Sequence, residues 1–296
     1  MEQEVRKTFA AGRFYTSNPE MLANQVAAFI KKVPDVIPAK GARAVILPHA
    51  GYEYSALTAI KTLLRADAGR FSRALIIAPS HRVPFRGIAT ADYSAYSTPL
   101  GSMKVDAAAV AAILGNESQY IQNLSETHDY EHSLEVELPL LHELNPEMQI
   151  IPIIAGFIDV VTAGHVALAL EQFWNKETLW VISSDFTHYG KAFSYEPFVS
   201  DVKKNLHELD MGAVNHILKF DLDGFNHYVN RTGATICGAG PIRILLAAVR
   251  LAIANGEKLQ AELVDYTTSG DLTGDFSHCV SYAGISITGN GLKAND

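Results

Sequence analysis

Three segments of the chain each combine an apolar run with polar side chains that can bind a metal ion. Each run has the length of a buried strand and is followed closely by the polar residue: 43–48 by His49, 73–78 by His81, and 179–184 by Asp185 and His188. The carboxyl ends of parallel strands meet at one edge of an α/β sheet, where ligands bind. Neutral imidazoles are good ligands for zinc, iron, copper and nickel. The pattern predicts a metal site at this edge, whereas each histidine alone would also suit a hydrogen-bonded loop.

Asp185 and His188 have the residue types needed for acid–base chemistry beside such a site. A carboxylate and an imidazole three residues apart can serve as metal ligand, general base or substrate anchor. The run Ser183–Ser184–Asp185 is also typical of the start of a helix, where Asp or Ser caps free backbone N–H groups. Both interpretations are open at this point.

Cys237 lies in a glycine-rich turn, 233–240, that leads into an apolar helix predicted over 241–254. The start of a helix lowers the pKa of a thiol, and a thiolate is a strong ligand for iron or zinc. The alternative is that Cys237 is a small buried apolar residue, as free cysteines often are. The second cysteine, Cys279, falls within an apolar strand and is predicted to belong to the core.

The stretch 126–132 is a dense polar cluster that we expect to open a helix, and its last two residues, Glu131 and His132, are followed by Glu135. Residues three or four apart lie on one helix face, so His132 and Glu135 are candidates to face the pocket or to support the metal ligands from behind. A solvated helix end is the alternative. Three tyrosines are candidates to line the pocket: Tyr15, Tyr52 and Tyr54. The remaining histidines are predicted on the surface: His128, His142, His165, His207, His216 and His227.

The rest of the chain alternates strands with helices. Helices are predicted from Pro19, capped by Asn18 or Ser17, to about 33, and over 57–64, 106–114, 134–141, 159–173 and 199–220; further strands are predicted at 87–90, 149–154, 260–267 and 278–287. This alternation favours a single α/β domain over 1–296, with a mostly parallel central sheet covered by helices on both faces. The last two strands would add antiparallel edges. The tyrosine-containing segment 92–101 is a candidate lid or interface.

Composition excludes several classes of protein. The 296 residues include 48% hydrophobic and 19% charged residues, and the net charge is -8. The acidic balance argues against nucleic acid as a partner. Neither a signal peptide nor an apolar run of membrane-spanning length is found, which argues against a membrane partner. Two cysteines form no disulfide framework, so we expect a cytoplasmic location.

The polar runs also resemble a known family. The segments that carry the resemblance are 11–15, 48–52, 79–81, 131–136, 183–190, 237–238 with 241–242, and 281–284. They are similar to the Memo family, whose bacterial and archaeal members are named AmmeMemoRadiSam system protein B. The resemblance implies a fold like that of the class III extradiol non-haem iron dioxygenases, the LigB-like fold.

The resemblance also implies roles for individual residues. His49, His81 and Cys237 would bind the metal, Asp185 and His188 would be catalytic, and three residues would surround that site: His132, Glu135 and Tyr52. The extradiol enzymes use two histidines and a carboxylate on Fe(II). A thiolate in place of the carboxylate is softer and oxidisable, so similarity of fold alone does not establish ring cleavage.

Three functions are compatible with these residues. The first is a dioxygenase-like oxidoreductase that uses Fe(II), with Zn or Cu as the alternative metals. The second, which the resemblance to the Memo family implies, is a non-catalytic binding protein that recognises a peptide or a phosphotyrosine-type ligand in the same pocket. The third is a zinc hydrolase, because two histidines, one cysteine and a water form an acceptable catalytic zinc site. The partner would be a small molecule or a peptide, and the family name implies a pathway shared with radical-SAM and Ammecr-type proteins.

Overall fold

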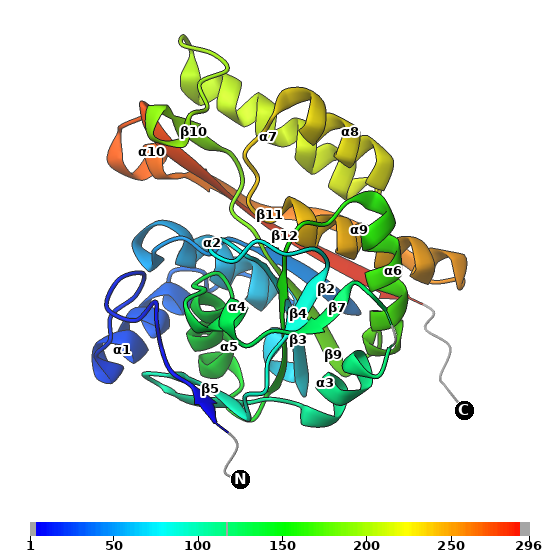
Figure 1. The fold of residues 1–296 in the computed structure, drawn as a ribbon. Coiled ribbons are helices and arrows are strands. Elements are labelled where there is room, and N and C mark those ends of the chain that lie inside the picture. The colour runs from blue at the N-terminus through cyan, green and yellow to red at the C-terminus, as the bar shows by residue number, and fades with distance from the viewer. Residues whose placement is uncertain (1–3, 117, 291–296) are drawn as a thin grey trace.

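A nine-stranded sheet runs through the middle of the protein (Figure 1). The computed structural model describes residues 4–116 and 118–290. Four neighbouring strands are parallel and form the centre of the sheet, in the order β2 (Ala42–Leu47), β9 (Thr178–Ser183), β3 (Arg73–Pro79) and β8 (Gln149–Ala155). The three strands predicted to deliver the polar site residues are therefore adjacent, which confirms the premise of the predicted site.

Further strands extend the sheet on both sides and join the central four through antiparallel pairs, β12 with β2 and β4 with β8. On one side are β12 (His278–Asn290), β11 (Lys258–Thr268) and β10 (His188–Gly190); on the other are β4 (Ile88–Thr90) and β7 (Ile121–Asn123). Strand β12 pairs with β2, β10 and β11, so it lies inside the sheet. The final strand pair is antiparallel as predicted, but only β11 forms an edge.

Helices cover both faces of the sheet (Figure 1). One face carries α6 (Val160–Leu170), α7 (Val202–Leu218), α8 (Leu222–Thr232) and α9 (Ala239–Ala254); the other carries α1 (Pro19–Lys31), α2 (Tyr52–Arg65) and α5 (Leu138–Leu144). Side chains alternate along a strand. In β2, Ala44 and Ile46 pack in one core while Val45 and Leu47 pack in the other. Burial on both faces explains the continuous apolar runs and confirms the predicted α/β class.

A small second sheet holds the N-terminal segment. It consists of β1 (Val5–Arg6), β5 (Ala95–Thr98) and β6 (Gly101–Lys104). The side chain of Tyr96 in β5 is 1% exposed. Much of the segment 92–101 is therefore held in a sheet with a buried tyrosine, which argues against a lid there, and an interface at this segment stays a prediction.

Several helix boundaries differ from the predicted ones. Asn18 caps α1 with Pro19 at the first position, as predicted. The stretch predicted as one helix over 199–220 is α7 alone, and the following α8 was not predicted. The remaining short helices are α3 (Ala107–Leu114), α4 (Glu126–Asp129) and α10 (Ser269–Thr273), with 3-10 turns at 68–70, 135–137, 171–173 and 191–193. No helix within the described residues has the length and apolar character needed to cross a lipid bilayer.

Candidate metal centre

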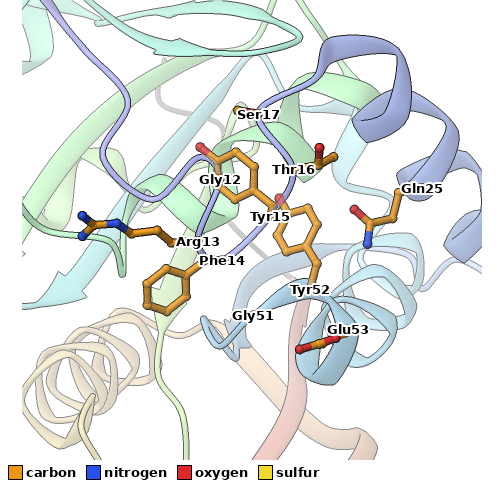
Figure 2. Close-up of a pocket in the computed structure, with 10 residues that line it drawn as sticks. All are labelled: Gly12, Arg13, Phe14, Tyr15, Thr16, Ser17, Gln25, Gly51, Tyr52 and Glu53. Carbon is orange, nitrogen blue, oxygen red and sulfur yellow. The ribbon is translucent and has the colours of Figure 1, made fainter.

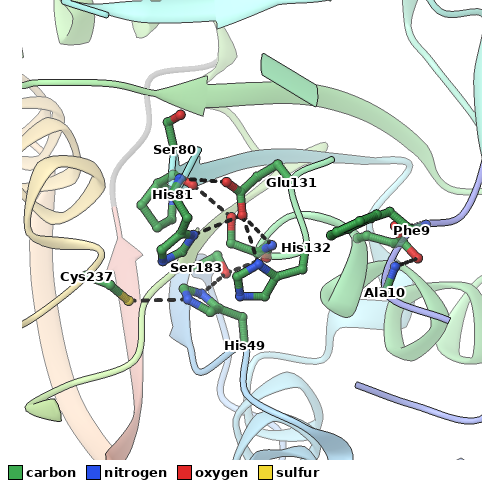
Figure 3. A network of polar contacts seen from close by, with 12 residues as sticks. Phe9, Ala10, His49, Ser80, His81, Glu131, His132, Ser183 and Cys237 are labelled. Carbon is green, nitrogen blue, oxygen red and sulfur yellow. Dashed lines mark hydrogen bonds and ion pairs between the residues drawn. The ribbon is translucent and has the colours of Figure 1, made fainter. Parts of the chain in front are cut away.

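The carboxyl ends of β2, β9 and β3 bring the predicted site residues together. His49 comes two residues after the end of β2, and His81 comes two residues after the end of β3. Between them lies β9, which ends at Ser183. The imidazole rings of His49 and His81 have centroids 5.4 Å apart. The strand-end pattern in the sequence therefore predicted a real convergence of the two histidines (Figure 3).

His49 is buried and held at two points. Its backbone N–H donates to Oδ1 of Asp185 at 2.8 Å, and its Nδ1 lies 2.7 Å from Oγ of Ser183. The Ser183 hydroxyl lies 2.7 Å from the carbonyl of Ser133, which can only accept. We therefore assign the proton to Nδ1 of His49, which leaves the lone pair on Nε2. Burial, followed by the nearby His81 and His132, holds the pKa of His49 well below its usual value, so the ring is neutral.

His81 is more exposed and is oriented by Glu131. The backbone N–H of His81 donates to Oε2 of Glu131 at 2.6 Å, and its Nδ1 lies 2.9 Å from Oε1. Burial opposes ionisation of Glu131, but hydrogen bonds from His132 and His81 together hold its pKa below the usual range. The carboxylate accepts a hydrogen bond from the Nδ1–H group, so Nε2 of His81 is also left free.

Cys237 approaches the histidines from the turn before α9. Its Sγ lies 3.3 Å from Nε2 of His49. The backbone N–H of Gly238 donates to Oγ of Ser184 at 3.2 Å, and a Cβ at Gly238 would meet Cβ of Ser184 at 2.3 Å. Only glycine allows the turn to pack this closely against the end of β9, and this close packing positions the thiol.

The protonation state of Cys237 corrects the sequence prediction. Burial, with the charge of Asp185 acting in the same direction, raises the pKa of the thiol well above its usual value. The start of α9 therefore does not produce a thiolate here, contrary to the prediction. A metal ion that binds this sulfur has to displace its proton, so binding releases protons and depends on pH.

The three donors fit a metal ion. One ligand atom each from His49, His81 and Cys237 can be chosen so that all lie within 4.8 Å of one another. Both imidazoles have Nδ1 engaged by a partner, as is usual for metal-binding histidines. A second group of donors includes His81 with Glu131 and His132. Because both oxygens of Glu131 already accept hydrogen bonds, we interpret this carboxylate as a group that orients the histidines.

Asp185 lies beside the donors but caps no helix. The chain continues from β9 into the short strand β10, so the helix-cap interpretation of Asp185 is wrong. Its carboxylate is 4% exposed and accepts the backbone N–H of His49. Burial raises the pKa of Asp185, although His188 opposes the shift. The arrangement ties the end of β9 to the residue that follows β2.

His188 is fixed by the segment that carries Cys237. Its backbone N–H donates to Oγ1 of Thr235 at 2.9 Å, and its Nδ1 lies 3.0 Å from the Thr235 carbonyl oxygen. A carbonyl only accepts, so Nδ1 carries the proton and Nε2 is the free nitrogen. This leaves one nitrogen of His188 able to accept a proton, as a general base requires.

His132 and Glu135 do not share one helix face, because residues 130–134 lie outside the helices. The ring of His132 stacks on Phe14 at 4.3 Å and lies 4.7 Å from His81. Glu135 is fully buried and accepts from the backbone of Ala10 at 2.9 Å and from the hydroxyl of Tyr15 at 2.6 Å. His132 thus lines the donor cluster, while Glu135 holds the N-terminal segment against it.

Tyr15 and Tyr52 line a pocket of about 360 Å³ beside the donor cluster (Figure 2). Other residues of its wall include Arg13, Phe14 and Gly51. The ring of Phe14 separates this pocket from His132. Tyr54 is not among the residues of that wall.

His128 is buried, so the prediction of a surface position is wrong. Its Nδ1 lies 2.8 Å from the hydroxyl of Tyr96, and its Nε2 lies 3.2 Å from the carbonyl of Ala89. Of the other histidines predicted on the surface, three are exposed and two are half-buried: His165, His207 and His227 in the first group, His142 and His216 in the second. Cys279 is fully buried, as predicted.

Three residues near the donors were not predicted as site residues. Ser183 orients His49, and Thr235 orients His188. The third is Glu137, whose Oε1 lies 2.9 Å from Oγ of Ser183. The side chain of Glu137 is fully buried. The position of Ser183 at the end of an apolar strand was the available signal. Thr235 and Glu137 offered none, because their partners are far away in the sequence.

Comparison with known proteins gives a family match over nearly the whole chain. The model of the Memo-like protein family matches residues 6–286. A MEMO1 family protein of Thermoplasma volcanium is 32% identical, covering 95% of this chain and 97% of its own length. A MEMO1 family protein of Schizosaccharomyces pombe is 30% identical, with 85% and 90% covered. The protein MEMO1 of Mus musculus is 28% identical, with 96% and 97% covered.

Proposed function

The chain belongs to the Memo family, and from this premise we propose that it is a non-haem iron oxidoreductase with Fe(II) bound by His49, His81 and Cys237. One observation carries the proposal. Two imidazoles whose Nδ1 atoms are engaged by partners, together with one thiol, come from three separate elements, and one ligand atom from each lies within 4.8 Å of the others. Nitrogen and sulfur donors of this kind suit iron, zinc and copper.

Fe(II) held by His49, His81 and Cys237 would supply redox chemistry and open coordination positions for O₂ and substrate. The protein supplies the proton transfer. His188 accepts or donates a proton at Nε2, since its Nδ1 is held by the carbonyl of Thr235. Asp185 acts as a positioning residue, because its carboxylate fixes the backbone of His49.

The thiolate ligand distinguishes this proposal from extradiol ring cleavage. A carboxylate in its place would resist oxidation, whereas Cys237 can be oxidised by O₂ and lost as a ligand. Iron loading therefore has to be measured without oxygen. The reaction class that fits is oxidation of a small substrate at an iron with one soft ligand.

Two other functions are the alternatives to this proposal. A zinc hydrolase would use the same three donors, with His188 or Asp185 as base. A non-catalytic protein would bind a peptide or phosphotyrosine-type group in the pocket lined by Tyr15 and Tyr52. We favour the oxidoreductase because a free acid–base nitrogen on His188 accompanies a donor set that includes an oxidisable thiol.

Metal content after anaerobic purification tests the proposal, with O₂ uptake measured after Fe(II) is added. Cys237→Ala removes a proposed ligand, and Cys279→Ala is the matched control because Cys279 is the other free cysteine, lies in β12 and accepts a hydrogen bond from the backbone of Gly270. We expect about one iron per chain in the wild type and the control. The Cys237→Ala variant should lose the iron and the O₂ uptake. Zinc without O₂ uptake would support the hydrolase, and a well-folded protein without metal would support the binding protein.

A further inference from the structure

Two arginines from distant parts of the chain meet on the ring of Phe9. The guanidinium carbon of Arg13 lies 5.1 Å from the ring centroid, and that of Arg82 lies 4.9 Å from it. The two carbons are therefore no more than about 10 Å apart, and both groups have the geometry of a cation–π contact. Such contacts hold each guanidinium in place while its N–H groups stay free to donate.

The pair lies beside the metal donors. Arg82 directly follows His81, and Arg13 directly precedes Phe14, whose ring stacks on His132 at 4.3 Å. Figure 2 shows the side chains of Arg13 and Phe14 extending to the same side of their segment, away from Gln25. Arg82 is thus next in sequence to a donor residue, and Arg13 is next to a ring that stacks on His132.

Neither guanidinium is neutralised by the protein. Within residues 4–116 and 118–290, the guanidinium groups of Arg13 and Arg82 form no ion pair and no hydrogen bond, and both residues are exposed. Other arginines are paired, such as Arg43 with Glu257 at 2.7 Å and Arg65 with Glu262 at 2.6 Å. Two like charges held close together repel each other, so an anion placed between them would be stabilised. This pair stands out in a chain whose net charge is -8.

We infer that Arg13 and Arg82 form an anion-binding subsite that holds the carboxylate or phosphate group of a small substrate beside His81. The inference rests on the proposed function in one respect. The reacting end of the substrate would extend from this subsite towards His49, His81 and Cys237. Guanidinium groups match planar carboxylates and phosphate oxygens through paired N–H donors. The substrate class is a small anionic molecule.

Calorimetric titration with inorganic phosphate and with benzoate tests the subsite, in metal-free and iron-loaded protein. The test variant is Arg13→Gln/Arg82→Gln. The matched control is Arg70→Gln/Arg231→Gln, because Arg70 stacks on Phe71 at 4.2 Å and Arg231 on Tyr228 at 5.3 Å. Both double variants remove two aromatic-stacked charges. The variant Arg13→Lys/Arg82→Lys keeps the charge but loses the paired N–H donors.

We expect the test variant to bind the preferred anion at least about tenfold more weakly, because charge-assisted hydrogen bonds are lost. The control should bind like the wild type, the lysine variant should fall between, and iron content should be equal in all four. Tighter binding of phosphate or of benzoate identifies the anionic group. Three results would overturn the subsite. They are equal affinity in the test and control variants, binding that depends on the metal and not on the arginines, and no binding by the wild type. If the protein takes up no metal but binds the anion through these arginines, the subsite is supported and the proposed oxidoreductase function is contradicted.

Discussion

Oγ of Ser183 lies 2.7 Å from Nδ1 of His49, so a hydroxyl at the end of β9 orients the imidazole that follows β2. The same hydroxyl lies 2.9 Å from Oε1 of Glu137. The proposed metal ligand is therefore fixed by a chain of buried polar groups that begins in the adjacent strand. Hydrogen-bonding partners of this kind set the tautomer and orientation of metal-binding histidines.

Ser183→Ala should lower metal affinity about tenfold to a hundredfold, because the imidazole of His49 loses the group that holds Nδ1. The control is Ser286→Ala in β12, since the hydroxyl of Ser286 is buried and has no hydrogen-bond partner among the described residues. Competition with a metal chelator measures both affinities. Equal affinities in the two variants would show that Ser183 does not orient the ligand.

Replacement of glutamate by glutamine should lower the free energy of unfolding at Glu135 but leave it almost unchanged at Glu137. Glu135 pairs with Arg6 and accepts from the hydroxyl of Tyr15. Glu135→Gln leaves the buried guanidinium unpaired, so the free energy of unfolding should fall by about 3–5 kcal/mol. Burial raises the pKa of Glu137 well above its usual value, so that carboxyl is already neutral.

Glu137→Gln replaces a neutral group by one of similar shape, so the free energy of unfolding should change by less than about 1 kcal/mol. Urea unfolding at pH 7 measures both variants. A loss at Glu137 as large as that at Glu135 would show that Glu137 is ionised in the folded protein. The two glutamates are matched, because both side chains are fully buried within two residues of each other.

His188→Ala should keep the metal and lose turnover. Its Nδ1 is held by Thr235, and its Nε2 is the nitrogen that we assign to proton transfer. Removal of a general acid–base group typically costs about a hundredfold to ten-thousandfold in rate. Metal content and O₂ uptake are measured together, with His227→Ala on the exposed face of α8 as control. Loss of the metal in His188→Ala would indicate that His188 is a metal ligand, which would contradict its assigned role in proton transfer.

The position of the donor cluster could be predicted because a simple rule of sheets governs it. Parallel strands bring the residues after their carboxyl ends to one edge, so two apolar runs followed by His49 and His81 were enough. Cys237 was harder to predict, because its contact with His49 depends on a turn that packs against Ser184. Its raised pKa follows from burial, which a helix-start argument does not include.

The segment around Glu135 could not be predicted in the same way. Its apolar spacing suggested one helix, but Pro139 cannot donate a backbone hydrogen bond to Glu135, so a helix cannot run through both without losing that bond. The chain forms a 3-10 turn there, and α5 begins at Leu138. Helix α8 was missed although Asp221 caps it, because the cap follows directly on a longer helix.

The buried position of His128 predicts a pH dependence of stability. Its Nδ1 and Nε2 contact Tyr96 and Ala89, which belong to segments distant in sequence, so its burial could not be inferred locally. Burial, with a smaller contribution from Arg6, lowers the pKa of His128 to about 3 from an ordinary value of 6.5. The ring is therefore neutral in the folded protein at every pH above about 3.

As the pH falls below 6.5, the unfolded chain takes up a proton at His128 and the folded chain does not. The stabilisation is complete above pH 6.5 and is lost progressively towards pH 3. Between pH 7 and pH 5 this single group should lower the free energy of unfolding by about 2 kcal/mol. Urea unfolding of the metal-free His128→Asn variant measures this contribution. Between pH 7 and pH 5, its free energy of unfolding should fall by about 2 kcal/mol less than that of the wild type. His165→Asn, at an exposed position in α6, should retain the wild-type dependence. An unchanged dependence in His128→Asn would mean that the folded protein also binds this proton.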